Sequence, residues 1–308
     1  MEVVGEMKHR KFGTHNQAVA GVIEALLMVA LVSVVISIIQ LVYIPQVMEQ
    51  KEAEHMDEVS NQIAYLKSVI DTQALTGSTS TNAPLSHVPM SSMITLGSRE
   101  LPYFVTASAF GDISVIHDKN SMIEKYRPLE VPIEISLLTS IVYHADNSYF
   151  VDQTYILEGG GIIVAQPDGE SVMRADPSIS IKNLSSIKTI ELEYYLPKII
   201  GISGKNTTSG TGRCFIRTNY SSCPPTTDNP IYPNQSIIIK SEYLNAWNES
   251  LNGLLGEENK TVTIKIGPDP TDFTKKVVLI YAKNLEYIIN LKLTIVYIEC
   301  QIGPGWVI

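Results

Sequence analysis

Few side chains in this sequence stand at spacings that would support catalysis or metal binding. The histidines are isolated along the chain, and none falls in an HExxH, HxH or Cys/His zinc pattern: His9, His15, His55, His87, His117 and His144. The chain also lacks a GxSxG nucleophile elbow and a Walker A loop. We therefore predict no catalytic residue, no metal site and no cofactor, and we expect that the protein is not an enzyme.

Two weaker patterns have an alternative, structural interpretation. His144 lies near Asp146 and could contribute acid/base chemistry, but isolated polar residues near strand ends are usually exposed to solvent. Asp269 and Asp272 lie in the segment GPDPTDFT, which could hold a cation but lacks the ligand spacing and the glycine of an EF-hand. The glycines 159–161 precede a predicted strand rather than a helix, so we interpret them as a turn.

The strongest chemical signal is a set of N-x-S/T sequons, the acceptor pattern for N-linked glycans. Such a glycan requires a surface position outside the cytoplasm. The sequons begin at Asn183, Asn206, Asn219, Asn234, Asn248 and Asn259. Their density predicts a glycoprotein in which some of these positions are modified.

Cysteine usage allows one disulfide. The chain has three cysteines, too few for a disulfide scaffold. Cys214 and Cys223 flank a short polar segment that a disulfide could close, which would leave Cys300 unpaired. We therefore predict a Cys214–Cys223 bond as the candidate pairing.

Charge and length limit the class of protein. The formal net charge is −9, and no Lys/Arg cluster follows residue 20, which argues against a nucleic-acid partner because phosphate binding requires a positive surface. A chain of 308 residues can hold a membrane segment and one or two globular domains.

An apolar run near the N-terminus predicts a transmembrane helix. Residues 18–43 read AVAGVIEALLMVALVSVVISIIQLVY, in which Glu24 is the only formal charge, and the run exceeds the roughly 20 residues that cross a bilayer. A cleaved signal peptide is the alternative, but its apolar region is shorter and ends at a small-residue cleavage site. Basic residues precede the run and acidic ones follow it, which predicts a cytoplasmic N-terminus and an extracytoplasmic C-terminal part.

The run continues into an amphipathic helical pattern that contains Val59, Ile63, Leu66 and Ile70. Pro45 should kink or interrupt this helix. A segment rich in Ser, Thr and Pro follows and is typical of a linker. The domain prediction is therefore a basic leader or tail (1–17), a transmembrane helix with a helical stalk (18–75), a linker (76–93) and a β domain (94–308).

The β domain is predicted from many short β-rich runs separated by turn signals, a pattern typical of an antiparallel sandwich or an open barrel. One amphipathic helix is expected within it, capped by Ser241 and containing Trp247 as a core residue. The fold class is therefore mainly β, with a long N-terminal helix followed by an antiparallel β-sandwich-like ectodomain.

The segment AVAGVIEALLMVA, residues 18–30, resembles the N-terminal segment of archaeal type IV pilins and archaellins, whose usual run is close to A-V-S-P-V-I-G. Ala20, Gly21 and Glu24 depart from that pattern, which puts leader cleavage in doubt more than anchoring. The resemblance implies a leader removed by a prepilin peptidase between residues 13 and 17, and assembly with copies of itself or other pilin-like subunits. Glu24 would take part in assembly, or would snorkel to the membrane interface.

Two functions follow from these patterns. The first is a pilin-like structural surface protein, anchored in the lipid bilayer by its apolar helix or assembling through it. The second is a permanently membrane-anchored cell-surface adhesion or binding protein that does not polymerise. Both place the protein in the cell membrane with a single span.

Overall fold

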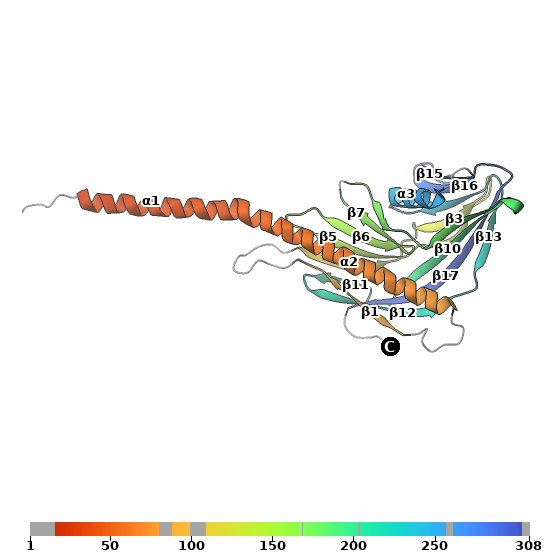
Figure 1. Cartoon of the computed structure of the whole chain (residues 1–308), viewed down its shortest axis with the longest axis horizontal. Coiled ribbons are helices and arrows are strands. Elements are labelled where there is room, and N and C mark those ends of the chain that lie inside the picture. Colours follow the sequence, from red (N-terminus) through yellow and green to blue (C-terminus); the bar gives the residue numbers. More distant parts are fainter. Residues whose placement is uncertain are drawn as a thin grey trace, which may run out of the picture. The chain divides into compact units, whose positions relative to one another are not determined.

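The computed structural model describes residues 16–79, 88–98, 109–167, 169–202, 204–256 and 261–303. These residues fall into two units, Met1–Gln50 and Lys51–Ile308. The first is helical and the second contains all the strands (Figure 1).

The first unit is a helix whose hydrogen-bond pattern changes before a proline. It contains α1 (Asn16–Ile38), the π-helical turn η1 (Ile39–Tyr43) and the start of α2 (Ile44–Thr79). Pro45 has no N–H to donate to the carbonyl four residues earlier, and the Ile44 N–H bonds to the Ile39 carbonyl five residues back. The interruption that Pro45 predicts is therefore a one-turn widening of the helix rather than its end.

The second unit is built from three sheets (Figure 1). Sheet A contains, in order, β1 (Met90–Thr95), β12 (Arg213–Ser222), β17 (Ile288–Ile302), β10 (Thr189–Gly201) and β9 (Ile179–Leu184), and β13 (Thr227–Ile231) also pairs with β17. Sheet B contains β11 (Thr207–Gly210), β2 (Phe110–Ile116), β5 (Ser140–Asp146), β6 (Gln153–Glu158), β7 (Gly161–Ala165) and β8 (Val172–Ala175). Sheet C contains β15 (Val262–Pro268), β16 (Lys276–Ala282), β14 (Ser236–Lys240), β3 (Met122–Tyr126) and β4 (Ile133–Leu137).

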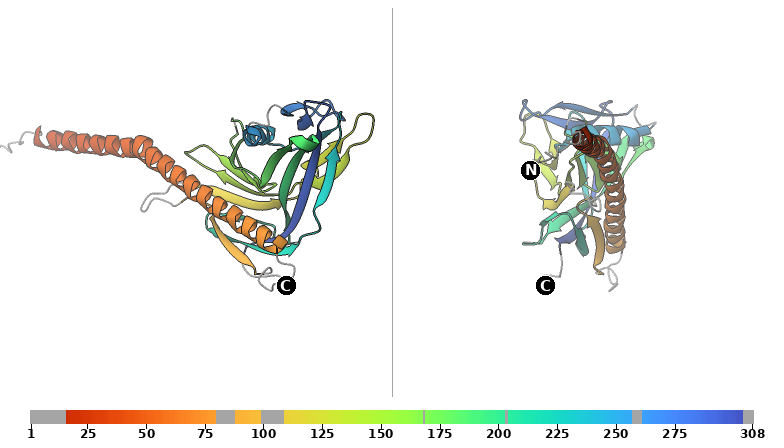
Figure 2. Two further views of the ribbon diagram at one scale, coloured as in Figure 1. Left: turned by 45° about the vertical axis from the view of Figure 1, so that its right-hand side comes forward. Right: turned by 90° about the vertical axis from the view of Figure 1, so that its left-hand side faces the viewer.

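The predicted fold class, mainly β with antiparallel sheets after a long N-terminal helix, is confirmed. Among the described strands, one pairing departs from it: β10 and β17 are parallel from Thr189↔Ile288 to Gly201↔Cys300. These two long strands run side by side through the centre of sheet A (Figure 2). Parallel neighbours need a long crossover, and here the segment between them supplies β11 to β16 and α3.

The helical stalk predicted for the segment before residue 75 is wrong for the part of α2 within the second unit. Its apolar face is buried against the inner faces of sheets A and B, through Met56, Val59, Ile63, Leu66, Ile70 and Ala74. This spacing of three and four residues forms one stripe along a helix. The stripe is covered by strands of the same chain, so this segment is a core helix of the β unit.

The predicted linker at 76–93 is also too long. Helix α2 continues to Thr79, and β1 begins at Met90 and pairs with β12. A Cβ added to Gly77 would overlap the Tyr220 ring, so this turn of α2 lies directly on β12. Residues 80–87 of the predicted linker lie outside the described residues.

Sheet B separates two hydrophobic cores. Tyr155 and Leu157 of β6 face the core around α2, whereas Ile156 between them faces the core around α3. Side chains alternate across a strand, so a strand covered on both faces is apolar at consecutive positions. The second core is closed by α3 (Leu244–Leu255), sheet C and parts of β9, β10, β13 and β17.

Helix α3 confirms the predicted amphipathic helix but not its cap. Trp247 is fully buried, as expected for a core residue. Tyr243 is the N-cap residue, and no side chain caps the helix. The Ser241 hydroxyl instead donates to Glu158 at 2.6 Å.

Candidate functional site

The apolar surface of α1 is the most distinctive feature of the first unit. Its large apolar side chains from Val22 to Ile38 are exposed, and the helix is long and apolar enough to cross a membrane. Glu24 lies within this surface, beside Ile23, Leu27 and Met28. An apolar face of this extent in water requires a cover, which lipid or another helix can supply.

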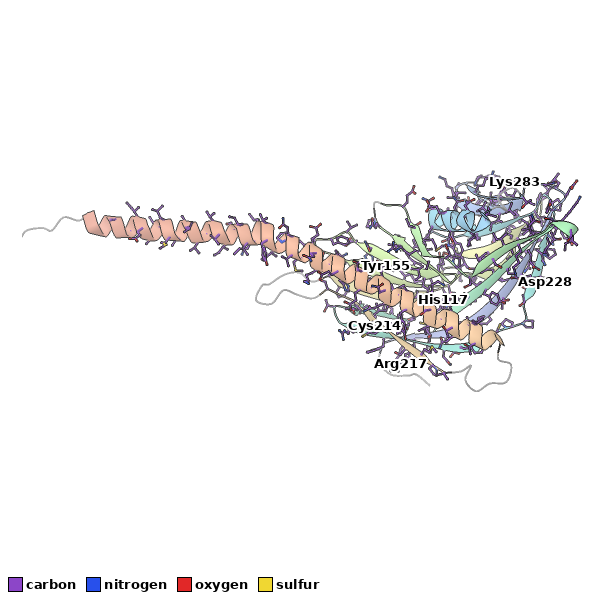
Figure 3. The ribbon with its side chains drawn as sticks, in the orientation of Figure 1. His117, Tyr155, Cys214, Arg217, Asp228 and Lys283 are labelled. Atoms are coloured by element: carbon purple, nitrogen blue, oxygen red, sulfur yellow. The ribbon has the colours of Figure 1, made fainter. Side chains whose placement is uncertain are left out.

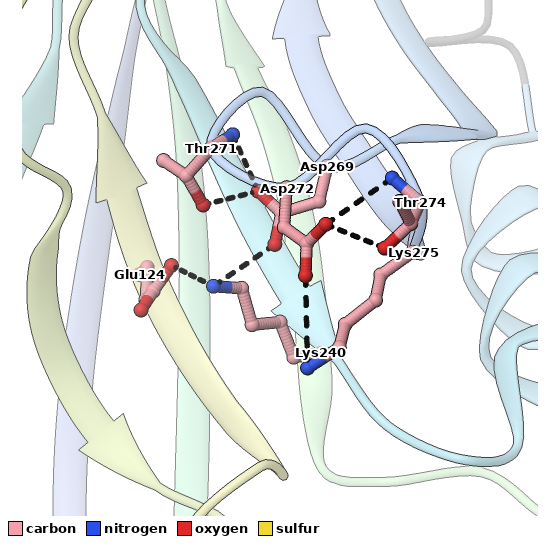
Figure 4. Close-up of polar contacts among 7 residues, drawn as sticks. All are labelled: Glu124, Lys240, Asp269, Thr271, Asp272, Thr274 and Lys275. Atoms are coloured by element: carbon pink, nitrogen blue, oxygen red, sulfur yellow. Dashed lines mark hydrogen bonds and ion pairs between the residues drawn. The ribbon is translucent and has the colours of Figure 1, made fainter.

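A charged cluster lies in the second unit, where Lys240 of β14 joins two carboxylates. Its ammonium lies 2.8 Å from Glu124 Oε2 and 3.1 Å from Asp269 Oδ2 (Figure 4). The Thr271 N–H and hydroxyl donate to Asp269 Oδ1 at 2.8 and 2.7 Å. Burial lowers the pKa of Lys240, but the two carboxylates outweigh that effect and raise it.

This cluster shows what surrounds Asp269 and Asp272, the residues considered for cation binding in the segment GPDPTDFT. The lysine ammonium occupies the position next to Asp269 that a bound cation would take. Asp272 instead accepts from the Thr274 N–H and hydroxyl and lies 3.8 Å from Lys275 (Figure 4). The sequence alone does not reveal that Glu124 and Lys240 are neighbours of Asp269, because the pairing of β3 with β14 brings Glu124 and Lys240 together.

A cleft of about 410 Å³ opens beside the cluster. It is lined by charged and hydroxyl side chains, among them Asp118, Ser121, Ser241, Glu242 and Lys275. Within the described part of the chain, no three His, Cys, Asp or Glu side chains form a group that could hold a metal ion. The charged and hydroxyl side chains that line the cleft can offer hydrogen bonds and paired charges to a ligand.

Glu158 is a buried carboxyl group at the end of β6. Its Oε1 accepts from Trp247 Nε1 at 2.8 Å and from Ser241 Oγ at 2.6 Å. Burial raises the pKa of Glu158, and these hydrogen bonds partly oppose the shift. The neighbouring Gly159 and Gly160 have positive φ and form the two-residue turn between β6 and β7, as the sequence predicts. Glu158 thereby connects sheet B to α3.

His55 of α2 is buried against sheet B. Its Nε2 lies 3.2 Å from the Tyr143 hydroxyl, which donates to the Leu96 carbonyl at 2.9 Å. With the hydroxyl proton in that bond, the Nε2–H tautomer of His55 can donate to the Tyr143 oxygen. Burial lowers the pKa of His55, which keeps it neutral near pH 7. A cleft of about 440 Å³ adjoins the ring and is also lined by Lys51, Glu58 and Arg213.

A second polar side chain of α2, Glu52, joins this helix to the turn between β5 and β6. Glu52 is fully buried, and its carboxylate accepts three backbone N–H groups: Ser148 at 3.1 Å, Tyr149 at 2.7 Å and Phe150 at 2.7 Å. Consecutive backbone N–H groups in a turn form a favourable site for an anion. Glu52 therefore satisfies the donors of a turn that lies 96 to 98 residues away in sequence.

The remaining candidate acid/base residues do not converge. His144 Nδ1 lies 2.9 Å from Thr154 Oγ1, a cross-strand pair on β5 and β6. Other nucleophilic and ionisable side chains are dispersed in the same way: Figure 3 labels Cys214, Asp228 and Lys283, which lie in separate regions of the β unit. Three of the histidines considered in the sequence, His9, His15 and His87, lie outside the described residues.

The predicted Cys214–Cys223 disulfide is wrong. All three cysteines are free thiols. Cys214 lies near the start of β12 and Cys223 just beyond its end. Nine residues of extended chain span roughly 30 Å, far more than the Cα separation of about 7 Å that a disulfide tolerates. Burial raises the pKa of Cys300 to about 12, so this thiol is held protonated.

The sequons differ in accessibility. Asn206 and Asn234 are exposed, and Asn234 lies in a turn with φ of +69°. Asn183 on β9, Asn219 on β12 and Asn248 in α3 are half-buried. Asn259 lies outside the described residues. Asn206 and Asn234 therefore offer the most accessible acceptor amides among the sequons that the structure describes.

A family model matches most of the chain. The match covers residues 17–278, from the first turn of α1 into β16, and so includes the apolar helix as well as most of the β unit. No curated protein and no solved structure matches the chain. The chain therefore belongs to the family described as "Family of unknown function (DUF7289)".

Proposed function

We propose that this protein is a pilin-like structural surface subunit, anchored in a membrane through α1 and presenting its β unit outside the cell. The observation that carries the proposal is the helix from Ala20 to Gly77, whose first part is apolar and exposed. Its later part is the core helix of the β unit. A membrane anchor is thus covalently continuous with the core of a folded domain.

Glu24 is the residue through which assembly would act. It is the only formal charge between residues 18 and 43. An ionisable group costs free energy in a membrane interior unless it is paired. In the proposed assembly, a group on a neighbouring subunit supplies that partner, and a prepilin peptidase removes the preceding leader. The proposed role is structural rather than catalytic.

The β unit supplies the exposed face of the proposed subunit. The acidic balance of the whole chain, with a formal net charge of −9, and the exposed Asn206 sequon of the β unit suit a glycosylated extracytoplasmic domain. Asn206 is exposed just before β11, and its backbone carbonyl accepts from the Val115 N–H of β2, which leaves the side chain as the accessible acceptor.

Fractionation of cells that express the full chain tests the proposal. We expect mature protein that starts between residues 14 and 18, recovered partly in the sheared surface fraction, as measured by intact mass and N-terminal sequencing. Glu24→Gln should remove protein from the sheared fraction while retaining it in membranes. Glu49→Gln, at an exposed position beyond the apolar run, is the matched control and should behave as the wild type.

An intact N-terminus confined to membranes, with no effect of Glu24→Gln, would contradict assembly. That result would leave a permanently anchored surface adhesion or binding protein. Recovery of the full chain from the soluble fraction would contradict the membrane anchor itself.

A further inference from the structure

Several turns of the second unit meet at one end of its sheets. Tyr126 at the end of β3 pairs with Ser236 at the start of β14, and Ile231 at the end of β13 pairs with Ile289 near the start of β17. The first N–H of β17 donates to the Lys188 carbonyl at 3.1 Å. The turns that precede β4, β10, β14 and β17 therefore lie together (Figure 1, beside the β13 label).

These turns and the first residue of β4 expose a group of apolar side chains, which we call the apolar tip: Leu129, Val131, Ile133, Ile187, Tyr232 and Leu285. Leu129 is 105% exposed and Val131 is 85% exposed, and the other four are between 46% and 64% exposed. Single exposed apolar residues are ordinary, but a group of this size on adjacent turns marks an interaction surface.

Leu129 is an aliphatic side chain exposed to water, and its backbone has a conformation that favours glycine. The Glu130 N–H donates to the Arg127 carbonyl at 3.2 Å, which closes a turn with Pro128 and Leu129 at its centre. Leu129 has φ of +66°, at a position where such a turn favours glycine. Folding of the chain alone gains nothing from an aliphatic side chain at this place, because the side chain is fully in water.

Two basic side chains beside the apolar tip form ion pairs with neighbouring carboxylates. Arg127 bonds to Glu130 at 3.1 Å, and Lys188 bonds to Glu286 at 2.6 Å. The chain as a whole carries −9, so two copies repel elsewhere on their surfaces, but little repulsion opposes a contact through this end. The pairing also leaves these cations less available for the phosphates of an anionic lipid surface.

We propose that the apolar tip is a docking surface for the apolar tip of a second copy of this chain. Six apolar side chains exposed to this degree offer an area comparable with the roughly 800 Å² that each partner buries in a standard interface. A two-fold contact places the same patch on both copies, so Leu129 of one copy can be buried by the other. This contact is separate from any association through α1.

Crosslinking between isotopically distinct copies tests the proposal. The full chain, produced without glycosylation because Asn234 lies in one of these turns, is reconstituted in lipid vesicles as a mixture of unlabelled and ¹⁵N-labelled copies. After treatment with a lysine-reactive crosslinker, mass spectrometry should find mixed-isotope links between Lys188 or Lys283 of one copy and the same lysines of another.

Leu129→Ser combined with Leu285→Ser should reduce these mixed links by roughly tenfold or more, since two leucines lose their burial at the contact. Both residues are exposed in the single chain, so its fold should be unaffected. Phe273→Ser is the matched control: Phe273 is 79% exposed on the β15–β16 loop, at the other end of sheet C, and the links should persist.

Three results would overturn the proposal. The first is the absence of mixed-isotope links at Lys188 and Lys283, and the second is links that survive the double substitution unchanged. The third is capture of added protein-free vesicles that the double substitution abolishes, which would assign the apolar tip to a lipid surface.

Discussion

Leu66→Ala measures whether α2 is a core helix of the β unit. Leu66 is 1% exposed on the apolar stripe of α2, in contact with the core formed by sheets A and B. The substitution removes three carbon atoms, worth about 0.8 kcal/mol each in transfer free energy. The cavity adds a further cost, and comparable Leu→Ala substitutions cost about 3 to 5 kcal/mol.

Thermal unfolding of the full chain in detergent provides the assay. For a unit of this size, about 2 to 4 °C of Tm accompanies each kcal/mol, so we expect Tm to fall by about 6 to 20 °C. Tyr65→Ala is the matched control, because Tyr65 is the neighbouring residue on α2 and is 58% exposed. It should change the free energy of unfolding by no more than about 0.5 kcal/mol.

Equal Tm values for the two variants would refute the reasoning, because they would mean that Leu66 is no more buried than Tyr65. The region from Lys51 to Thr79 would then be the independent stalk that its charged sequence suggests. Unfolding should be followed at two signals, circular dichroism of the whole chain and tryptophan fluorescence, with both variants carrying Trp306→Phe so that the fluorescence reports Trp247 in the second core. A loss of coincidence between them would show that the two cores unfold separately.

Three further predictions concern buried polar groups. Burial lowers the folded-state pKa of His55 below its ordinary 6.5. The stability contributed by neutral, buried His55 is therefore complete above about pH 6.5 and is lost as pH falls below that value. Between about pH 7 and about pH 5, urea unfolding should show a larger loss of unfolding free energy in the wild type than in His55→Gln. Glu158→Ala leaves the Trp247 and Ser241 donors unpaired and should cost about 2 to 4 kcal/mol, whereas Glu158→Gln keeps an acceptor and should cost less, measured by the same unfolding. In the native chain a thiol reagent should modify Cys223 first, and all three cysteines only after unfolding; a mass lower by two hydrogens would instead reveal a disulfide.

The helical and strand content was accessible to sequence reasoning, because local periodicity and turn residues carry it. The β-branched runs Ser236–Lys240 and Lys276–Ala282, for example, form the strands β14 and β16. The Gly159–Gly160 turn and the buried Trp247 were also predictable, since each depends on one local property. Glu24 and the apolar run were evident from composition alone.

The pairing between distant segments could not be predicted from the sequence. No local pattern reveals that β10 and β17 pair in parallel, because their partners are set by the whole crossover between them. The Lys240–Glu124–Asp269 cluster and the apolar tip likewise depend on strand register and on which turns share an end. The Ser241 hydroxyl was expected at a helix cap but bonds to a carboxyl group more than eighty residues away in sequence.

The sequence by itself thus determined that this chain has an apolar N-terminal helix, a β-rich remainder and an acidic, sequon-bearing surface, since composition and periodicity are local. Only the tertiary structure decided that the amphipathic half of the helix is a core element and that Cys214 cannot reach Cys223. A helix with one apolar stripe is equally suited to a coiled stalk or to a sheet, and its surroundings decide which surface covers the stripe. The distance between two cysteines likewise depends on whether the chain between them turns or extends, and β12 extends it.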